Sequence, residues 1–321
     1  MNSPSPRARM QPIGQPSRLE MSLRHFFGWV YVKSLDWVRA GGDDHALPRS
    51  RTLTKLFILS EEKIASRNLP CAYGPERTAE IAKGRFEYLS RLMVDISRLK
   101  GAGRAGILEQ VRVSGEEHLA AASAEGRGVM VVSAHAGTWW HAAAVTGSLG
   151  YTNSSVLTQF LPNAIVRFLD GVAAELGSTL AFVRGGAYEV ARAAFGKRNT
   201  FYLSFDFASR PDRSVWMAVN ERAAIPVDTG PGVMAIRHRV PLVWVDTWHD
   251  ENGRSCIRYY PAIHAGRGTA YPTPVAVMGY LVDRLSEQIE RHPEQWWLLG
   301  HGDLKDPRDV EVQNRPAVAS E

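Results

Sequence analysis

The sequence predicts an α/β protein, with a mixed central sheet flanked by helices and a helical amino-terminal extension. From about residue 105 onward, short β-branched or apolar runs alternate with helical patterns, which is typical of a sheet with helices on its faces. Before that point, residues 53–102 show a basic, helical pattern. The apolar positions that share one face of this pattern are Ile81, Phe86, Leu89, Met93 and Ile96.

The individual elements follow from periodicity and from turn residues. Strands are predicted over residues 128–133, 154–159, 180–183, 200–206, 214–219, 241–249 and 255–263. Helices are predicted between them, over residues 138–148, 164–176, 187–195, 230–238 and 274–291. We find no internal repeat and no long linker after residue 104. We therefore expect one catalytic-scale domain over residues 105–306, preceded by a helical layer over residues 20–104.

Two tails are expected outside these parts. Residues 1–19 are rich in Pro, Ser and Arg and lack the apolar core of a secretory signal, so we expect a disordered tail. Residues 307–321 form the carboxyl-terminal tail of this division.

Composition and missing motifs narrow the class of protein to a soluble globular one. The chain of 321 residues is 45% hydrophobic and 22% charged, as in an ordinary soluble globular protein. Its formal charge of +5 mildly favours anionic partners, although the basic residues are scattered. The two distant cysteines, Cys71 and Cys256, suit a reducing compartment and predict a cytoplasmic protein. Zinc-hydrolase spacing, a serine-hydrolase elbow and a nucleic-acid-binding module are all missing, and we expect neither a metal nor a cofactor.

The aromatic segment 24–38 raises the question of membrane contact. Lys33 and Asp36 interrupt it, and it is shorter than the roughly 20 apolar residues of a spanning helix. A helix docked on the core is the interpretation we favour, and an interfacial helix at the inner face of the cell membrane is the alternative. The apolar residues at helical spacing are Phe27, Tyr31, Leu35 and Val38.

The stretch SAHAGTWWH, residues 133–141, follows a predicted buried strand and precedes a helix start. Thr138 is a good N-cap for a helix that begins at Trp139. His135 is therefore expected in a loop at the carboxyl end of a strand, the usual ligand crevice of an α/β sheet. An imidazole there can take a proton from an attacking hydroxyl or amine, while helix-start amides steady an oxyanion. The alternative is a structural loop histidine.

The same stretch resembles the His-x4-acid block of the bacterial lipid A biosynthesis acyltransferases, the lauroyl and myristoyl transferases of the wider glycerolipid acyltransferase superfamily. Residues 201–248 are similar to the family's second block, in which a strand ends in an aspartate and a Thr-Gly pair opens a helix. Residues 290–307, ERHPEQWWLLGHGDLKDP, resemble its closing block. The resemblance covers roughly residues 80–306. It implies a glycerolipid-acyltransferase-like fold, and an acyltransferase with His135 as general base.

The sequence departs from this pattern at the acid. In the family, the residue five places after the histidine is Asp or Glu, whose carboxylate holds the imidazole tautomer, and here it is Trp140. Either another group orients His135, or the chemistry no longer needs that group, or catalysis is gone. Asp206 is our first candidate for the orienting group and His141 the second, with Thr138 also near in sequence. Asp206 could instead cap a loop, and His141 could be a packing residue.

A second departure concerns the substrates. Gly302 and Asp303 stand where the family has paired arginines, and an aspartate there would repel the phosphates of a lipid A precursor. The family's arginine after the strand near Val156 is also missing, with Gln159 the closest residue. These changes argue against lipid A as acceptor. The residues expected to contact substrate, although surface or capping roles are open for several of them, are Thr138, Trp139, Trp140, Gln159, Arg210, Thr229 and Gly230.

The function we expect is acyl transfer from an acyl carrier protein, a CoA thioester or another activated acyl donor. The acceptor would be a hydroxyl or amine of a small or carrier-bound molecule. The alternative, from another class, is a non-catalytic acyl-binding or partner-binding relative of the family.

Overall fold

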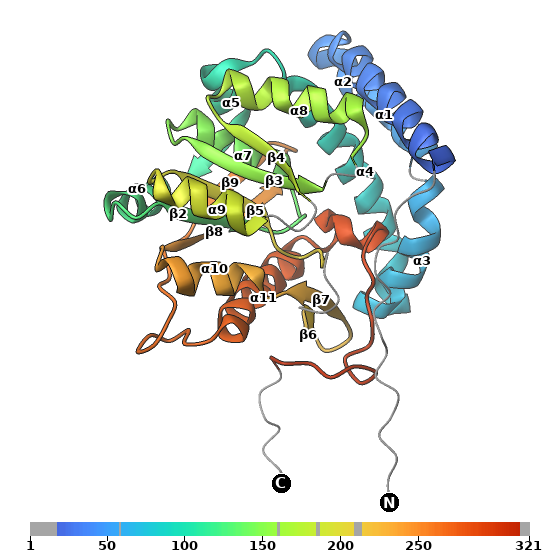
Figure 1. The fold of residues 1–321 in the computed structure, drawn as a ribbon. Coiled ribbons are helices and arrows are strands. Elements are labelled where there is room, and N and C mark those ends of the chain that lie inside the picture. The colour runs from blue at the N-terminus through green and yellow to red at the C-terminus, as the bar shows by residue number, and fades with distance from the viewer. Residues whose placement is uncertain (1–17, 58, 159–160, 184–186, 209–213, 315–321) are drawn as a thin grey trace, which may run out of the picture.

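The computed structural model describes residues 18–57, 59–158, 161–183, 187–208 and 214–314 (Figure 1). A central sheet lies between helices on both of its faces, and the amino-terminal helices pack along one side of the molecule. The α/β class with a mixed central sheet and a helical extension is therefore confirmed.

Within the described residues, the amino-terminal layer contains four helices, and the helical pattern predicted over residues 53–102 covers the last two of them and the end of the second. Gly74 separates two of them, because its φ of 82° is incompatible with a helix and Pro75 follows it. Of the expected tail, Arg18 and Leu19 are helical, and residues 1–17 lie outside the described residues. The helices are α1 (Arg18–Arg39), α2 (Gly42–Phe57), α3 (Leu59–Tyr73) and α4 (Pro75–Leu99).

The main sheet has seven strands in the order β1-β9-β8-β2-β5-β3-β4. All its neighbours are parallel except β8 and β9, which makes the sheet mixed. The strands are β1 (Val111–Ser114), β2 (Val129–Ser133), β3 (Asn153–Thr158), β4 (Thr179–Val183), β5 (Thr200–Ser204), β8 (Leu242–His249) and β9 (Ser255–Tyr259). The short strand β1 was not predicted from periodicity.

The five helices predicted from residue 138 onward agree with the observed ones to within a few residues, whereas the helices at residues 103–110 and 116–124 were not predicted. A separate hairpin is formed by β6 (Ser214–Ala218) and β7 (Ala224–Asp228). The helices are α5 (Gly103–Gln110), α6 (Glu116–Ala124), α7 (Trp139–Ser148), α8 (Asn163–Glu175), α9 (Ala187–Gly196), α10 (Gly230–His238) and α11 (Pro274–Arg291), followed by the short 3₁₀ helices η2 (Pro293–Gln295) and η3 (Trp297–Gly300).

The core has two halves, one on each face of the sheet. All five residues of β2 are buried, as expected for a central parallel strand. Because side chains alternate along a strand, Met130 and Val132 face one half of the core while Val129 and Val131 face the other. The carboxyl end of β2 is thus held from both faces by packed side chains.

Helix α1 docks on the core, but not through the whole stripe that the sequence suggested. Leu35 and Val38 are buried, whereas Phe27 is 58% exposed. Gly28 takes the contact position instead, because a side-chain Cβ there would come within 2.1 Å of the Cβ of Pro162. Among the described residues, no helix combines the length and the apolar character needed to cross a bilayer.

Candidate active site

His135 lies in the short loop between β2 and α7, at the carboxyl end of a strand in the middle of the sheet. β5 and β8 run parallel to β2 on either side, so their carboxyl ends reach the same edge. Helix α7 begins at Trp139, as expected, with Thr138 at the N-cap position. The Thr138 side chain is fully buried and makes no capping hydrogen bond with any described residue.

Asp206 lies against His135. Its Oδ1 is 2.7 Å from Nδ1 of the His135 ring, and the backbone N–H of His135 donates to both carboxylate oxygens, at 2.9 and 3.1 Å. The register of the two strands explains this contact, because Ser133 of β2 pairs with Ser204 of β5 and each chain then runs two residues further. A carboxylate can only accept, so Nδ1 carries the proton and Nε2 is left with its lone pair.

The carboxylate of Asp206 is itself held in place. Its side chain is fully buried, and Nε1–H of Trp296 donates to its Oδ2 at 3.2 Å. The next residue, Trp297, donates its backbone N–H to the carbonyl of His135 at 2.8 Å. The closing segment of the domain is therefore bound directly to both members of the pair.

Aromatic rings surround the exposed part of His135, whose side chain is 24% exposed. Its ring centroid lies 5.8 Å from that of Trp139 and 5.6 Å from that of Trp297. His301 stacks on Trp297 at 3.6 Å. Nε2 has no hydrogen-bond partner within the described part of the chain. The geometry leaves a basic nitrogen at an apolar, partly open position, where it can take a proton from a bound hydroxyl or amine.

The other predicted site residues are spread more widely. Trp140 is half-buried, its ring lies 6.0 Å from that of Trp139, and it packs against the core half that contains α7. Thr229 and Gly230 begin α10 after β7, and the Thr229 side chain does not cap that helix. Gln159 and Arg210 lie outside the described residues. A substrate contact by any of these residues stays a prediction.

His141 belongs to a different cluster. It is completely buried, and burial lowers its pKa, so the imidazole is neutral in the fold. The charged groups that act on it are Asp95 and His249, while Nδ1 of His135 is occupied by Asp206. The structure therefore brings one of the two predicted orienting groups to His135 and places the other among buried polar residues.

Sequence reasoning missed Trp296 and Trp297, although the paired tryptophans in the closing block were a visible signal. In the described part of the chain, no group of three or more His, Cys, Asp or Glu side chains is arranged to hold a metal ion.

Comparison with known proteins shows a similarity to acyltransferases. A solved structure, the 1-acyl-sn-glycerophosphate (LPA) acyltransferase PlsC from Thermotoga maritima, is 15% identical in sequence and has a TM-score of 0.35, covering 75% of this chain and 98% of its own. Residues 15–165 match the model of the bacterial lipid A biosynthesis acyltransferase family. The matched segment includes His135 and ends before Asp206.

Curated relatives agree with the family model. The phosphatidylinositol mannoside acyltransferases of two Mycobacterium tuberculosis strains, CDC 1551 / Oshkosh and ATCC 25618 / H37Rv, are each 25% identical over 219 residues. The match covers 63% of this chain and 64% of each relative, which is less than two thirds of their length. The family model and these relatives together relate this chain to the lipid A biosynthesis acyltransferases.

Proposed function

We propose that the protein transfers an acyl group from a thioester donor, such as acyl-CoA or an acyl carrier protein, to a hydroxyl or amine of a lipid-borne acceptor. The observation that carries this proposal is the His135–Asp206 pair, with Nδ1 and Oδ1 2.7 Å apart at the carboxyl edge of the sheet. An imidazole whose far nitrogen is held by a buried carboxylate is the usual arrangement of a general base.

In the proposed reaction, one proton passes from the acceptor to His135 and then to the leaving group. Nε2 of His135 removes the proton from the acceptor hydroxyl as its oxygen attacks the thioester carbonyl carbon. The tetrahedral intermediate collapses, the carbon–sulfur bond breaks, and the leaving thiolate takes the proton back from the imidazolium. The products are an ester and a free thiol. Asp206 stabilises the imidazolium in the middle of this sequence.

The start of α7 is suited to stabilise the oxyanion of the tetrahedral intermediate. The first N–H groups of a helix have no intrahelical acceptor and carry the positive end of the helix dipole. Because α7 begins at Trp139, these groups lie only a few residues beyond His135. Trp139 and Trp297 exclude water from one side of the imidazole, which strengthens such interactions.

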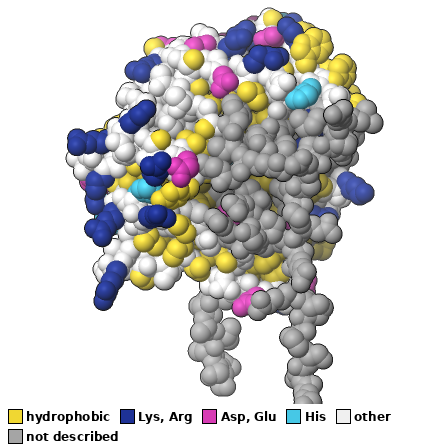
Figure 2. Space-filling view, in the orientation of Figure 1, with side chains coloured by type: hydrophobic (Ala, Val, Ile, Leu, Met, Phe, Trp, Pro, Cys, Tyr) yellow, Lys and Arg dark blue, Asp and Glu magenta, His cyan; other side chains and the backbone are white. Residues whose placement is uncertain are grey.

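We propose a lipid-borne acceptor for two reasons. The mycobacterial relatives are named for acylation of a glycolipid. In addition, α1 carries an apolar stripe away from the core, and Figure 2 shows hydrophobic side chains gathered over this helix. Arg24 and Lys33 are exposed on the same helix and suit anionic headgroups. The exposed members of the stripe are Leu23, Phe26, Phe27, Trp29 and Trp37.

Helix α1 also contacts the start of α8. Gly28 packs on Pro162, and the backbone N–H of Asn163 donates to Nδ1 of His25 at 3.2 Å. Pro162 and Asn163 form the start of α8, which follows the carboxyl end of β3, and β3 runs parallel to β5. A bilayer touching α1 would thus hold a lipid acceptor close to His135, and the protein would act as a peripheral membrane enzyme.

Single-turnover transfer from radiolabelled palmitoyl-CoA tests the function. The acceptors are phosphatidylinositol mannoside in vesicles, a lipid A precursor in vesicles and a soluble alcohol and amine. We expect transfer to one of the vesicle-borne acceptors, and a loss of at least about 10²-fold in His135→Ala. His264→Ala is the matched control, because His264 also faces a carboxylate, Glu125, at 3.3 Å.

Three results of this experiment would contradict parts of the proposal. Unchanged transfer by His135→Ala contradicts the general-base role. Transfer only to the soluble acceptors overturns the lipid-borne acceptor and restores the small acceptor that the sequence suggested. Acyl-CoA binding without transfer by the wild-type protein favours a non-catalytic acyl-binding relative.

A further inference from the structure

Both backbone polar groups of Gly137, two residues after His135, are bound by side chains or segments from distant parts of the chain. Its N–H donates to the carbonyl of Gln295 at 2.9 Å, and its own carbonyl accepts the hydroxyl of Tyr88 at 3.0 Å. Its φ is +57°, and a Cβ there would come within 1.8 Å of the carbonyl oxygen of Thr247. The loop is thus pressed against the end of β8 at this residue.

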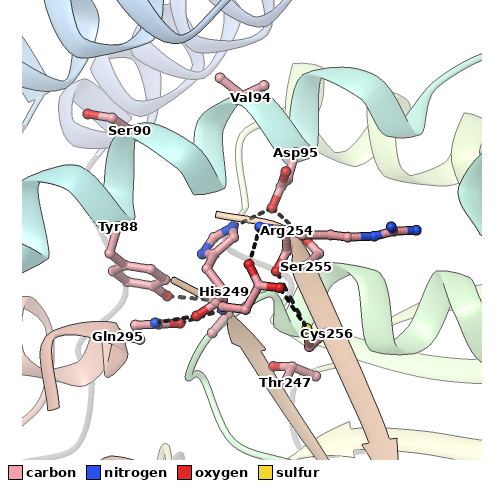
Figure 3. Close-up of polar contacts among 12 residues, drawn as sticks. Tyr88, Ser90, Val94, Asp95, Thr247, His249, Arg254, Ser255, Cys256 and Gln295 are labelled. Atoms are coloured by element: carbon pink, nitrogen blue, oxygen red, sulfur yellow. Dashed lines mark hydrogen bonds and ion pairs between the residues drawn. The ribbon is translucent and has the colours of Figure 1, made fainter. Parts of the chain in front are cut away.

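His249, the last residue of β8, contacts both of these partners. Its backbone N–H donates to Oε1 of Gln295 at 2.8 Å, and its carbonyl accepts Nε2–H of the same amide at 3.0 Å. Its ring meets the ring of Tyr88 edge-on, with centroids 6.0 Å apart. Figure 3 shows the three side chains together, with Tyr88 projecting from α4. We call Tyr88, His249 and Gln295 the Gly137 clamp.

Asp95 anchors the clamp from α4, two helical turns beyond Tyr88. Its Oδ2 lies 2.6 Å from Nε2 of His249 and accepts the hydroxyl of Ser255 at 2.7 Å (Figure 3). Burial would raise the pKa of Asp95, but the hydrogen bond and charge of His249 outweigh it and lower that pKa, so the carboxylate stays ionised. A largely buried carboxylate with two hydrogen-bond partners holds them in one geometry.

The neighbouring carbonyls of the loop are held in the same way. Oγ1–H of Thr247 donates to the carbonyl of Ala136 at 2.6 Å, next to the bond from Trp297 to the carbonyl of His135. Three successive carbonyls therefore accept donors from β8, α4 and the closing segment. Asp206 holds the N–H and the ring of His135, so the histidine is fixed from both sides of the loop.

We propose that the Gly137 clamp, anchored by Asp95, positions His135 for proton transfer without touching the substrate. The inference rests on the proposed acyl transfer. A displacement of about 1 Å in a catalytic group can cost about 10²-fold in rate, so a loop held through its carbonyls controls kcat more than binding. These are positioning residues, because the contacts that link them to His135 pass through the backbone of Gly137.

Tyr88→Phe tests the clamp, because it removes the hydroxyl that binds Gly137 and keeps the ring. We expect kcat to fall about tenfold with KM within about twofold of wild type. Tyr259→Phe is the matched control: Tyr259 is equally buried, and its hydroxyl lies 3.0 Å from Oγ1 of Thr146, away from the loop. Tyr259→Phe should lose stability but keep kcat.

A second pair of variants tests the anchor. Asp95→Asn keeps an acceptor for His249, whereas Asp95→Ala removes it, so the asparagine variant should retain several-fold more kcat than the alanine variant. Equal kcat in the folded fractions of both variants contradicts the anchoring role.

Hydrogen exchange separates this inference from the function on which it rests. Exchange of the backbone amides at residues 134–138 should become faster in Tyr88→Phe and remain unchanged in Tyr259→Phe. Unchanged exchange, or wild-type kcat in Tyr88→Phe, overturns the clamp. If wild type transfers no acyl group, the proposed function fails and positioning for catalysis fails with it, whereas faster exchange still assigns the loop contact to Tyr88.

Discussion

One carboxylate, that of Asp206, binds His135 at two places, accepting the ring Nδ1–H at 2.7 Å and the backbone N–H at 2.9 Å. It therefore holds both the tautomer of the imidazole and the loop that carries it. The position at which the family has its acid is occupied by Trp140, which packs against the core instead.

Asp206→Asn should lower kcat by about 10²- to 10⁴-fold, because an amide can stabilise the wrong imidazole tautomer and cannot stabilise an imidazolium. Asp246→Asn is the control, since Asp246 is also buried and also accepts a tryptophan Nε1–H, that of Trp244, at 2.7 Å. Steady-state kinetics and thermal unfolding of both variants provide the comparison. A kcat within tenfold of wild type in Asp206→Asn would show that the pair is structural only.

Restoring the family's acid should not increase activity. In Trp140→Glu a new carboxylate finds Nδ1 of His135 already occupied by Asp206, and the tryptophan's packing is lost. We expect a lower melting temperature and a kcat no higher than that of wild type, with Trp140→Phe as the control for lost volume. An increase in kcat would mean that the family's acid position is latent and that Asp206 is a weaker substitute.

Gly137→Ala should destabilise the protein more than a change of backbone conformation explains. A left-handed backbone costs a non-glycine residue on the order of 1–3 kcal/mol, and here a Cβ would also lie 1.8 Å from the carbonyl oxygen of Thr247. Gly126→Ala is the control, because its φ is +71° and no atom lies within 4 Å of the position of its Cβ. Denaturant unfolding measures both variants, and equal losses of stability would contradict the close approach.

Stability should fall as the solution becomes mildly acidic, in part through His141. Burial lowers the pKa of His141 in the folded state, so below pH about 6.5 the unfolded chain binds a proton that the fold excludes. The stabilisation is complete above that pH and is lost as the pH drops below it. His141→Gln should flatten the dependence of the unfolding midpoint on pH between about 7.5 and 5. His45→Gln, on the exposed start of α2, should leave the slope as in wild type.

Binding to anionic vesicles should depend on the α1 stripe. Replacing Phe26 and Phe27 by serine removes two exposed aromatic side chains and should cut cosedimentation with phosphatidylglycerol vesicles several-fold while leaving thermal stability unchanged. Leu56→Ser on α2 is the control, because Leu56 is exposed outside α1. Equal cosedimentation of the two variants would place the contact elsewhere.

Local sequence patterns were sufficient to predict much of the secondary structure of this molecule. Alternation of β-branched runs with helical periods predicted the class and most elements, because each strand and helix must match the period of its own backbone. The position of His135 at a strand end followed from the apolar run before it and the helix start after it. The stripe on α1 was ambiguous because that helix has apolar residues on two faces. In the structure, Leu35, Val38 and the close fit of Gly28 against Pro162 mark the face that docks.

The sequence by itself determined the α/β class, the place of His135 in a loop between strand and helix, and the short list of groups that could orient it. Only the tertiary structure decided that Asp206 is the group that contacts the imidazole ring of His135. Strand register puts residue 206 opposite residue 135, and the folding of α4, β8 and the closing segment brings Tyr88, Thr247 and Trp297 onto the loop. Such contacts join residues far apart in the chain, and they depend on packing and register that no local pattern encodes.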